Sequence, residues 1–491
     1  MELLYNLTDT RDEIKKELYI KRNIYRENNN FLKGDIWDFF TYFNAFSIKK
    51  WKRYTTIKKV RINMEFQGEV EVTIRLKGLD NNGVLIKEIC SNGYSGTFNM
   101  EQLNGDILGI SIKAISEYVL YFGGAYYGEF DQWQDISIGI GICTFKREQY
   151  VLRTLNTILQ IKKRCSWLKV LIVDNGNTLP ERDDDVRIVH NLNYGGSGGF
   201  TRVLLEYVKG DSVDYILLMD DDIVLDSHVL VRTYSFLCGL KNNYRKSFLS
   251  GAMLNLERPN VQYENTAYWG RVRLHGFGNN LDMRKQRNLI INEYFQTVKN
   301  QYGAWWYCCI PITRVRKIGY PLPIFIKGDD MEYGIRNCQP VLSLNGIAVW
   351  HQSFSTKVNP VVNYYSDRNM LIINHFADGC NIVTFAIAVI GRIIKRSFKF
   401  NLIGLQMLYL ALKDYQSGLD GITAIGADEK MKQVQQYSKE RTSFSIILNL
   451  LKYAIKTILL YPSTHQKYKD FREQKLKTPE FWIKYLRIGE D

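Results

Sequence analysis

The chain has 491 residues, of which 45% are hydrophobic and 24% are charged. This balance predicts a globular protein of about two to four domains and excludes a disordered or fibrous chain. The formal net charge of +14 favours an anionic partner, namely a phosphorylated substrate, a phospholipid surface or a nucleic acid.

The first predicted domain, residues 1–133, has a strand-like pattern over most of its length. Segments in which apolar and polar residues alternate are separated by Gly or Asn turns; they cover residues 60–66, 70–78, 83–89 and 118–128. This pattern is typical of an antiparallel β-sandwich. Met1–Leu18 contains no basic region followed by an apolar run, so we expect no signal peptide and a cytosolic protein.

The second predicted domain, residues 134–362, alternates strands with helices. Apolar strands are predicted over residues 136–145, 168–176 and 214–224, with a helix over residues 147–159. Strands that are apolar on both faces belong to a mostly parallel sheet covered by helices, which predicts an α/β, Rossmann-like fold. The carboxyl ends of parallel strands lie at one edge of the sheet, where we expect the ligand site.

The third predicted region, residues 363–491, is helical and basic. Its last 101 residues, 391–491, contain 18 Lys and Arg against 10 Asp and Glu. No apolar run reaches the ~20 residues that span a bilayer. Within residues 444–462, apolar residues recur at helical spacing while Lys452 and Lys456 lie on another face. This suits a helix that lies on anionic lipid, or alternatively an amphipathic core helix. The eight cysteines are scattered without a C-x-x-C pair, which predicts free thiols.

An acidic triplet, Asp220-Asp221-Asp222, directly follows an apolar strand. Adjacent carboxylates repel one another, and a divalent cation bound by the alternate residues Asp220 and Asp222 relieves that repulsion. A solvated turn is the alternative. His351 also follows an apolar stretch, where a histidine is usually structural. If it lies at the same edge of the sheet, it completes a ligand set for Mn²⁺ or Mg²⁺.

A second acidic group, Asp329, Asp330 and Glu332, precedes a short helical pattern over residues 333–337. Helix capping explains one carboxylate at such a position but does not require three. One of them is therefore a candidate general base that takes a proton from an acceptor hydroxyl group.

A glycine-rich run over residues 193–202 is predicted to be a loop that opens another helical pattern. It lacks the Lys-Ser/Thr of a P-loop, and Thr201 occupies the position of the third glycine in G-x-G-x-x-G. Backbone N–H groups at this helix start are candidates for contact with phosphate or sugar oxygens, and a loop built for tight packing is the alternative.

Trp305 and Trp306 are adjacent. In a strand only one of them faces the core, which leaves the other to stack on a sugar ring in a cleft; an interface anchor is the alternative.

In this order, the motifs resemble those of a family 2 glycosyltransferase with the GT-A fold. The resemblance to the nucleotide-binding half of that fold rests on residues 140–147, residues 173–176 and the acidic triplet. More narrowly, five motifs resemble bacterial galactofuranosyltransferases that extend galactan chains: NYGGSGGFTR, MDDD, WW followed by Pro311, FIKGDDMEYG and VWHQ. The resemblance implies an N-terminal β-sandwich, a central GT-A domain and a C-terminal helical region. Gly328 stands where the galactan enzymes carry a bulky aromatic residue, which leaves the acceptor and the linkage open.

The resemblance also implies roles for individual residues. Asp220, Asp222 and His351 would hold the metal ion. Asp330 would be the base, with Asp329 and Glu332 orienting the acceptor and Trp305 and Trp306 lining its site. The donor would be bound by Thr144, Arg147, Asp174, Asn193, Gly198, Gly199 and Asp221.

The implied function is an inverting, metal-dependent transfer of galactofuranose from UDP-galactofuranose to a polyprenyl-diphosphate-linked glycan. Alternatives are transfer from another donor, such as dTDP-rhamnose or a UDP-hexose, a nucleotidyltransferase, and a noncatalytic glycan-binding protein. A nucleotidyltransferase needs a glycine-rich loop directly after the first strand, and the segment CTFKRE has no glycine there. The basic C-terminal region predicts an enzyme at the inner face of the cell membrane, on anionic lipid. No nucleic-acid-binding motif is present, and the sequence leaves a homo-oligomer open.

Overall fold

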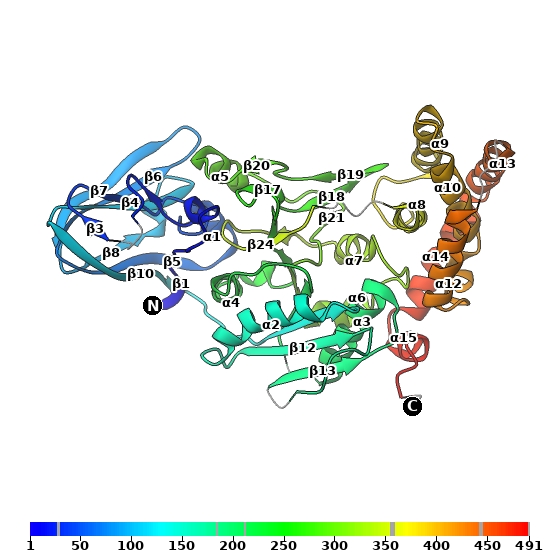
Figure 1. The fold of residues 1–491 in the computed structure, drawn as a ribbon, viewed down its shortest axis with the longest axis horizontal. Helices are drawn as coiled ribbons and strands as arrows, with labels where there is room; N and C mark the ends of the chain where they lie inside the picture. The colour runs from blue at the N-terminus through cyan, green and yellow to red at the C-terminus, as the bar shows by residue number, and fades with distance from the viewer. Residues whose placement is uncertain (27–29, 183–184, 211–212, 354–358, 441–444, 490–491) are drawn as a thin grey trace.

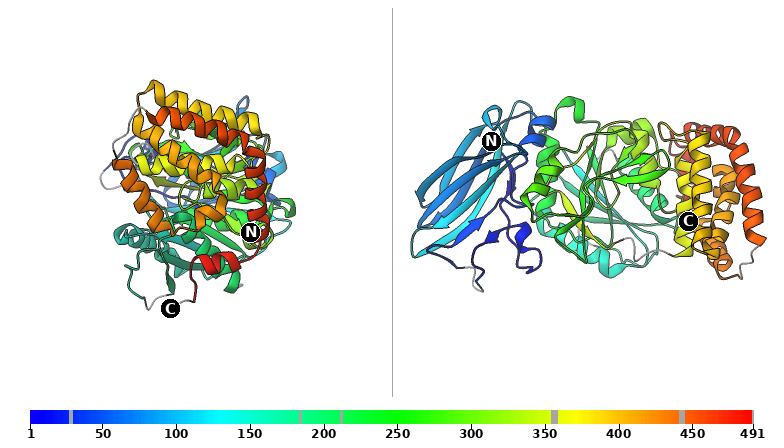
Figure 2. Two further views of the ribbon diagram at one scale, coloured as in Figure 1. Left: turned by 90° about the vertical axis from the view of Figure 1, so that its right-hand side faces the viewer. Right: turned by 90° about the horizontal axis from the view of Figure 1, so that it is seen from above.

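The computed structural model describes residues 1–26, 30–182, 185–210, 213–353, 359–440 and 445–489. Three parts follow one another along the long axis of the molecule: N-terminal β-sheets, a central α/β part and C-terminal helices (Figures 1 and 2). This arrangement confirms the predicted fold class. The exact domain boundaries stay predictions.

The N-terminal part consists of two antiparallel sheets. One sheet contains β1 (Glu2–Asn6), β10 (Tyr118–Phe130), β5 (Ile57–Gln67) and β8 (Tyr94–Asn99), with β3 (Phe31–Leu32) paired to β10. The other contains β2 (Lys21–Arg22), β4 (Ile36–Asp38), β9 (Ile107–Ala114), β6 (Glu69–Lys77) and β7 (Asn82–Ser91). Alternate residues of β5 and β6 are buried in one hydrophobic core between the sheets, as the period of two predicts.

The helix α1 (Ile48–Tyr54) joins this part to the central one. Its fully buried Trp51 packs edge-on against Phe236 of α4 (His228–Cys238), with 5.1 Å between ring centroids. Edge-to-face aromatic pairs of this kind stabilise an interface beyond their buried area.

The central sheet has the strand order β13 (Val186–His190), β12 (Leu168–Asp174), β11 (Ile138–Thr144), β14 (Tyr215–Asp220), β22 (Cys308–Pro311), β15 (Phe248–Ser250) and β23 (Val341–Leu342). The first four strands are parallel, and β22 is antiparallel to both of its neighbours. The remaining helices of this part are α2 (Glu148–Lys162), α3 (Gly195–Gly210), α5 (Gln286–Glu293), α6 (Ile312–Ile318) and α7 (Asp329–Asn337). The register pairs Thr144 with Asp174 and Cys143 with Asp220, so the polar residues after these strands lie at one edge, as predicted.

Two smaller sheets complete the central part. One has the order β20 (Leu281–Asp282), β17 (Val261–Glu264), β16 (Ala252–Asn255) and β24 (Ala348–His351), and the other has the order β19 (Arg273–Gly276), β18 (Ala267–Gly270) and β21 (Gln301–Tyr302). A β-bridge joins Val224, just after the acidic triplet, to Trp350, through N–H···O bonds of 2.8 and 3.0 Å. This bridge fixes β24 beside the end of β14.

The C-terminal part is helical, as predicted. It contains α8 (Pro360–Ile373), α9 (Ile382–Phe398), α10 (Leu402–Gln416), α11 (Gly418–Thr423), α12 (Ala427–Lys439), α13 (Ser445–Leu459), α14 (Tyr461–Lys475) and α15 (Glu480–Tyr485). Short 3₁₀ turns elsewhere span Lys16–Leu18, Met100–Gln102 and Asn242–Tyr244. The buried Trp482 of α15 donates a hydrogen bond of 3.0 Å to the carbonyl of Pro321 and so anchors the end of the chain on the central part.

Among the described residues, no single helix has the length and apolar composition needed to cross a membrane, although α13 and α14, bent by 66°, meet those criteria as a pair. All eight cysteines are free thiols, as predicted.

Candidate active site

A cavity of about 530 Å³ lies at the carboxyl end of β14. We call it the acidic cavity because six carboxylates line it against two cationic side chains. These residues are Asp220, Asp221, Asp222, Glu264, Asp329 and Asp330, with Arg147 and Lys327. His351, Trp305 and Trp306 also line it. The fold therefore brings together motifs that lie as far apart as residues 147 and 351.

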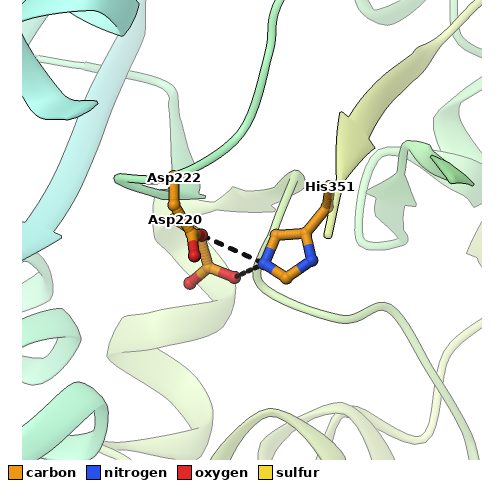
Figure 3. A group of neighbouring side chains, drawn as sticks. All are labelled: Asp220, Asp222 and His351. Atoms are coloured by element: carbon orange, nitrogen blue, oxygen red, sulfur yellow. Dashed lines mark ion pairs between the residues drawn. The ribbon is translucent and has the colours of Figure 1, made fainter. Parts of the chain in front are cut away.

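Asp220, Asp222 and His351 form a compact group whose potential ligand atoms all lie within 4.8 Å of one another (Figure 3). His351 Nε2 lies 3.0 Å from Asp222 Oδ1 and 3.8 Å from Asp220 Oδ2. The Nδ1 atom of His351 lies 2.6 Å from the carbonyl oxygen of Gln352. A proton on Nδ1 that is donated to this carbonyl leaves the Nε2 lone pair facing the carboxylates, which is the arrangement of a metal-ligating histidine. Two carboxylates and one imidazole fit Mn²⁺ or Mg²⁺.

The middle residue of the triplet, Asp221, is held by protein side chains. Thr144 Oγ1 donates a hydrogen bond of 2.7 Å to Asp221, and Arg147 Nη1 lies 3.2 Å from Asp221 and 3.0 Å from Asp222. Burial raises the pKa of Asp221 to about 6, although Thr144 and Arg147 oppose the shift. Thr144 and Arg147 therefore orient the triplet, and of the two only Arg147 lines the cavity.

Asp174 lies at the end of β12 and is fully buried. Its carboxylate accepts hydrogen bonds from the backbone N–H groups of Gly176, Thr178 and Leu179, at 2.9, 2.6 and 2.7 Å. These bonds shape the loop after β12. Asp174 does not line the acidic cavity, and its contact with the donor stays a prediction.

The glycine-rich run forms the first turns of α3 and not a loop, which corrects the prediction. A Cβ atom on Gly199 would lie 2.0 Å from Cys143 Sγ of β11, and one on Gly198 would lie 2.3 Å from Tyr194 Cβ. Gly199 thus allows close packing of the helix on the sheet, and Gly198 allows close packing on Tyr194 before the helix, in agreement with the tight-packing alternative. Asn193 accepts a hydrogen bond of 3.1 Å from the N–H of Gly195 and donates one to Asp428. Of this run, Gly196 and Phe200 line the cavity.

The second acidic group begins helix α7, which starts at Asp329 and therefore earlier than predicted. Gly328 precedes it with φ of +93°, and a Cβ atom there would lie 2.6 Å from Ile373 Cδ1. The left-handed backbone conformation thus favours glycine at this position, and a larger residue would also have to displace the end of the Ile373 side chain. Asp329 and Asp330 line the cavity, and burial raises the pKa of both carboxyl groups, to about 8 at Asp329, where the charge of Asp330 adds to the effect, and to about 6 at Asp330.

Glu332 is separate from these two carboxylates. It is fully buried, forms an ion pair with Arg336, and lies 3.6 Å from Arg472 Nη1. It does not line the acidic cavity, so its placement does not support the predicted contact with the acceptor.

Trp305 and Trp306 lie in a turn before β22, and both are buried, which corrects the expectation of a strand with one open indole. Trp306 Nε1 donates a hydrogen bond of 2.9 Å to the carbonyl of Gly251. Trp305 packs edge-on against Phe200, with 5.2 Å between centroids, and its Nε1 has no hydrogen-bond partner among the described residues. Of the two indoles, Trp305 therefore has the N–H group that is available to donate a hydrogen bond to a ligand.

Three further residues of the cavity are not among the predicted site residues: Glu264, Tyr302 and Lys327. Glu264 ends β17 and is 6% exposed; burial and the nearby Asp330 raise its pKa to about 7. Its segment, VQYEN, has no motif, so only the tertiary structure reveals it. Lys327 directly precedes the GDD segment, and this adjacency was the available signal.

Comparisons with known proteins agree with the motifs. Residues 139–244 match the family model "Glycosyl transferase family 2", and residues 10–102 match "Galactofuranosyltransferase 2 N-terminal". The chain is 26% identical over 377 residues to galactofuranosyltransferase GlfT2 of Mycobacterium tuberculosis and 26% identical over 375 residues to that of Mycolicibacterium smegmatis. Each match covers 68% of this chain and 57% of the relative, so the chain spans little more than half the length of these relatives.

The chain is also similar to the solved structure of Staphylococcus aureus TarS 1-349, at 15% identity and a TM-score of 0.37, with 68% of this chain and 91% of that chain covered. A mannosyltransferase from Pyrobaculum calidifontis in complex with GDP-Man and Mn²⁺ has 11% identity and a TM-score of 0.33, with 67% and 90% covered. Similarity at such low sequence identity and TM-score does not identify a ligand of this chain. Residues 139–244 thus match the model of family 2 glycosyltransferases, in a chain that is similar to bacterial galactofuranosyltransferases over about two thirds of its length.

Proposed function

We propose that this chain transfers galactofuranose from UDP-galactofuranose to a hydroxyl group of a growing cell-surface glycan. One observation carries the proposal: a candidate metal-ligand group and a buried acidic pair line the same cavity, in a chain similar to galactofuranosyltransferases. Glycosyl transfer needs both elements, because the departing diphosphate accumulates negative charge while the acceptor loses a proton.

Asp220, Asp222 and His351 are proposed to hold Mn²⁺ or Mg²⁺. A divalent cation at this group neutralises negative charge on the diphosphate of the donor. Arg147, which contacts both Asp221 and Asp222, fixes the carboxylates for this task. Without a cation the six carboxylates of the cavity would repel a diphosphate, which is why we propose a metal-dependent reaction.

Asp330 is proposed to be the general base. It takes the proton of the acceptor hydroxyl group while that oxygen bonds to C1 of the sugar, and the bond between C1 and the diphosphate oxygen breaks with its electrons going to UDP. A single displacement of this kind inverts the configuration at C1. The raised pKa of Asp330 makes it a stronger base than an ordinary aspartate. Asp329, with the higher pKa of the pair, is proposed to stay protonated and to orient the acceptor as a hydrogen-bond donor.

The acceptor is proposed to be a polyprenyl-diphosphate-linked glycan, at the inner face of the cell membrane. Support comes from the apolar side chains that α9 and α13, which pack against each other, expose to solvent. They are Val383, Ile387, Ile390, Ile394, Leu448, Leu451, Ile455 and Leu459. Exposed Lys452 and Lys456 lie on α13 beside them. An apolar helix face bordered by lysines suits anionic lipid.

A panel of nucleotide sugars tests the donor. We expect Mn²⁺-dependent hydrolysis in the absence of acceptor to be fastest with UDP-galactofuranose, compared with UDP-galactopyranose, UDP-glucose and dTDP-rhamnose. Faster hydrolysis of another nucleotide sugar would still indicate a glycosyltransferase, but one whose donor is not UDP-galactofuranose. Release of pyrophosphate from UTP and a sugar phosphate would instead identify a nucleotidyltransferase.

A further inference from the structure

A second cavity, of about 830 Å³, lies where the central part meets the C-terminal helices. We call it the basic cavity; its polar wall consists of Lys299, Arg336, His375, His465, Lys469 and Arg472. It shares two elements with the acidic cavity. Helix α7 contributes Asp330 to the acidic cavity and Arg336 to the basic one, while β21 contributes Tyr302 and Gln301 respectively.

The two cavities have opposite charge. Four cationic side chains line the basic cavity against one carboxylate, Asp378, whereas six carboxylates line the acidic cavity against two cations. A concave surface lined by one sign of charge concentrates ions of the other sign. The basic cavity is therefore suited to an anion, without the cation that the acidic cavity needs.

Neighbouring groups of the protein hold Arg336 and Arg472 in place. The buried carboxylate of Glu332 forms an ion pair with Arg336 and lies 3.6 Å from Arg472. Arg336 also donates hydrogen bonds to the carbonyls of Ile318 and Tyr320, and the Arg472 guanidinium lies 4.5 Å from the ring centroid of Phe376. One buried carboxylate thus orients two guanidinium groups. Arg472 also forms an ion pair with Glu473, with 3.1 Å between Nη2 and Oε1, so carboxylates offset part of the charge of both arginines. This gives Glu332 a positioning role in the basic cavity.

The two lysines are exposed, and neither has a carboxylate partner within the part of the chain that the structure describes. Lys299 comes from the segment before β21 and Lys469 from α14, so they approach the cavity from different parts of the chain. Their charge is available to a ligand at the cost of ordering two flexible side chains.

The two histidines add hydrogen-bonding groups to the cavity. His375 Nδ1 lies 3.0 Å from His465 Nδ1, and His375 Nε2 is hydrogen-bonded to the hydroxyl of Tyr415. Burial lowers the pKa of His375 well below its usual value, and His465 and Lys469 lower it further. His375 is thus uncharged near neutral pH, and the positive charge of the cavity comes from its lysines and arginines.

We propose that the basic cavity binds a phosphate-bearing anion through its phosphate or diphosphate group. Guanidinium and ammonium groups that converge from three elements match the several oxygens of such a group, and the volume lies in the range of small-molecule sites. The proposal does not depend on the transfer reaction. The phosphate belongs either to a free anion or to a lipid-linked molecule, and both have the same charged group.

Calorimetric titration of the full chain with inorganic pyrophosphate, in EDTA to exclude binding through a metal ion, tests the site. We expect saturable binding with about one equivalent. The double variant Lys299→Glu with Lys469→Glu should bind at least tenfold more weakly. The matched control, Lys432→Glu with Lys467→Glu, makes the same change in net charge at exposed lysines outside the cavity and should bind like the wild type.

Absence of saturable binding to the wild type, or an equal loss in both double variants, would overturn the proposal, because the effect would then be absent or due to net charge alone. A parallel titration with farnesyl diphosphate identifies the source. Tighter binding than pyrophosphate supports a lipid-linked ligand, and binding that is no tighter supports a free anion. Binding of UDP with Mn²⁺, measured in the same variants, should be unchanged and keeps this test separate from the proposed transfer.

Discussion

Asp330 combines two properties that a general base needs. It lines the acidic cavity, and burial raises the pKa of its carboxyl group, so that its ionised form accepts a proton more readily than an ordinary aspartate does. Its neighbour Asp329 has a pKa raised further, so the pair shares one proton over a range of pH. We expect the rate of transfer to rise with pH as Asp330 ionises, at a pH above the usual titration range of aspartate.

Replacing Asp330 separates chemistry from binding. Asp330→Asn should lower the rate of transfer by a factor of about 10² to 10⁴, because the amide cannot take the proton. Binding of UDP in the presence of Mn²⁺ should change less than twofold, because Asp330 is not in the ligand group. Asp80→Asn, an exposed change outside both cavities, is the control. If Asp330→Asn reduces UDP binding as much as transfer, the residue binds the donor or supports the fold.

Glu264 gives a prediction about stability and pH. Its pKa is raised from 4.5 to about 7 by burial, so in the range between these values the folded chain holds a proton that the unfolded chain has lost. This residue therefore destabilises the metal-free fold progressively as the pH rises, by about 3 kcal/mol once the pH exceeds 7.

Glu264→Gln removes this penalty. In EDTA, the variant and the wild type should have similar free energies of unfolding at pH 4, and the variant should be more stable by up to about 3 kcal/mol at pH 8. Urea unfolding at the two pH values measures the difference, with the exposed change Glu2→Gln as control. A difference that does not grow with pH would show that Glu264 is not held protonated by burial.

At the scale of the elements, the close packing of α3 on β11 explains why Gly199 of the glycine-rich run is a glycine. A Cβ atom on Gly199 would lie 2.0 Å from Cys143 Sγ, so Gly199→Ala should destabilise the chain by roughly 1–3 kcal/mol. Gly391 of α9 has no atom within 4 Å of the corresponding position, and Gly391→Ala should stabilise by up to about 1 kcal/mol. Thermal unfolding measures both variants.

The partner of Gly199 supplies a second control. Cys143→Ala removes the sulfur atom that an alanine at position 199 would meet, so the double variant should recover part of the lost stability. A Gly199→Ala variant with normal stability and weakened UDP binding would instead support the predicted donor contact.

Local sequence patterns predicted the elements well and their contacts less well. The apolar strands β11, β12 and β14 were recognisable because they are buried on both faces. The glycine-rich run was predicted as a loop, but glycine is tolerated at the start of α3 because the sheet lies so close. The start of α7 was predicted too late, because a carboxylate cluster in the first turn also suits a ligand site.

At the scale of the whole molecule, the C-terminal helices carry the prediction of membrane binding. The variant Ile455→Asp with Leu459→Asp places two charges on the exposed apolar face of α13. Its binding to vesicles of phosphatidylcholine and phosphatidylglycerol should be at least tenfold weaker than that of the wild type, as measured by sedimentation.

The opposite end of the molecule provides a matched control. Val84→Asp with Ile89→Asp changes two equally exposed apolar residues of β7, in the N-terminal sheets (Figure 2). This variant should bind vesicles like the wild type. If both variants bind vesicles equally well, the exposed face of α13 does not contact the membrane.

The arrangement of the acidic cavity could be anticipated only in part. The triplet and His351 were expected to converge because strand ends meet at one edge of a sheet, and the bridge between Val224 and Trp350 brings His351 there. Asp330, which precedes the helix predicted from the sequence, was assigned to the same site only by the family resemblance. Glu264, by contrast, reaches the cavity from a separate small sheet, and Glu332 turns away to pair with Arg336 and Arg472. Neither position follows from local spacing, because both depend on how distant segments pack.

The most direct test of the proposed active site is calorimetric titration of UDP into the full chain at increasing Mn²⁺, with the wild type, Asp222→Ala and His351→Ala. The account predicts that UDP binding by the wild type depends on Mn²⁺ and that each substitution weakens this binding at least tenfold, because Asp220, Asp222 and His351 are proposed to share one ion. Binding of UDP that is independent of Mn²⁺, or that is unchanged in both variants, would contradict it.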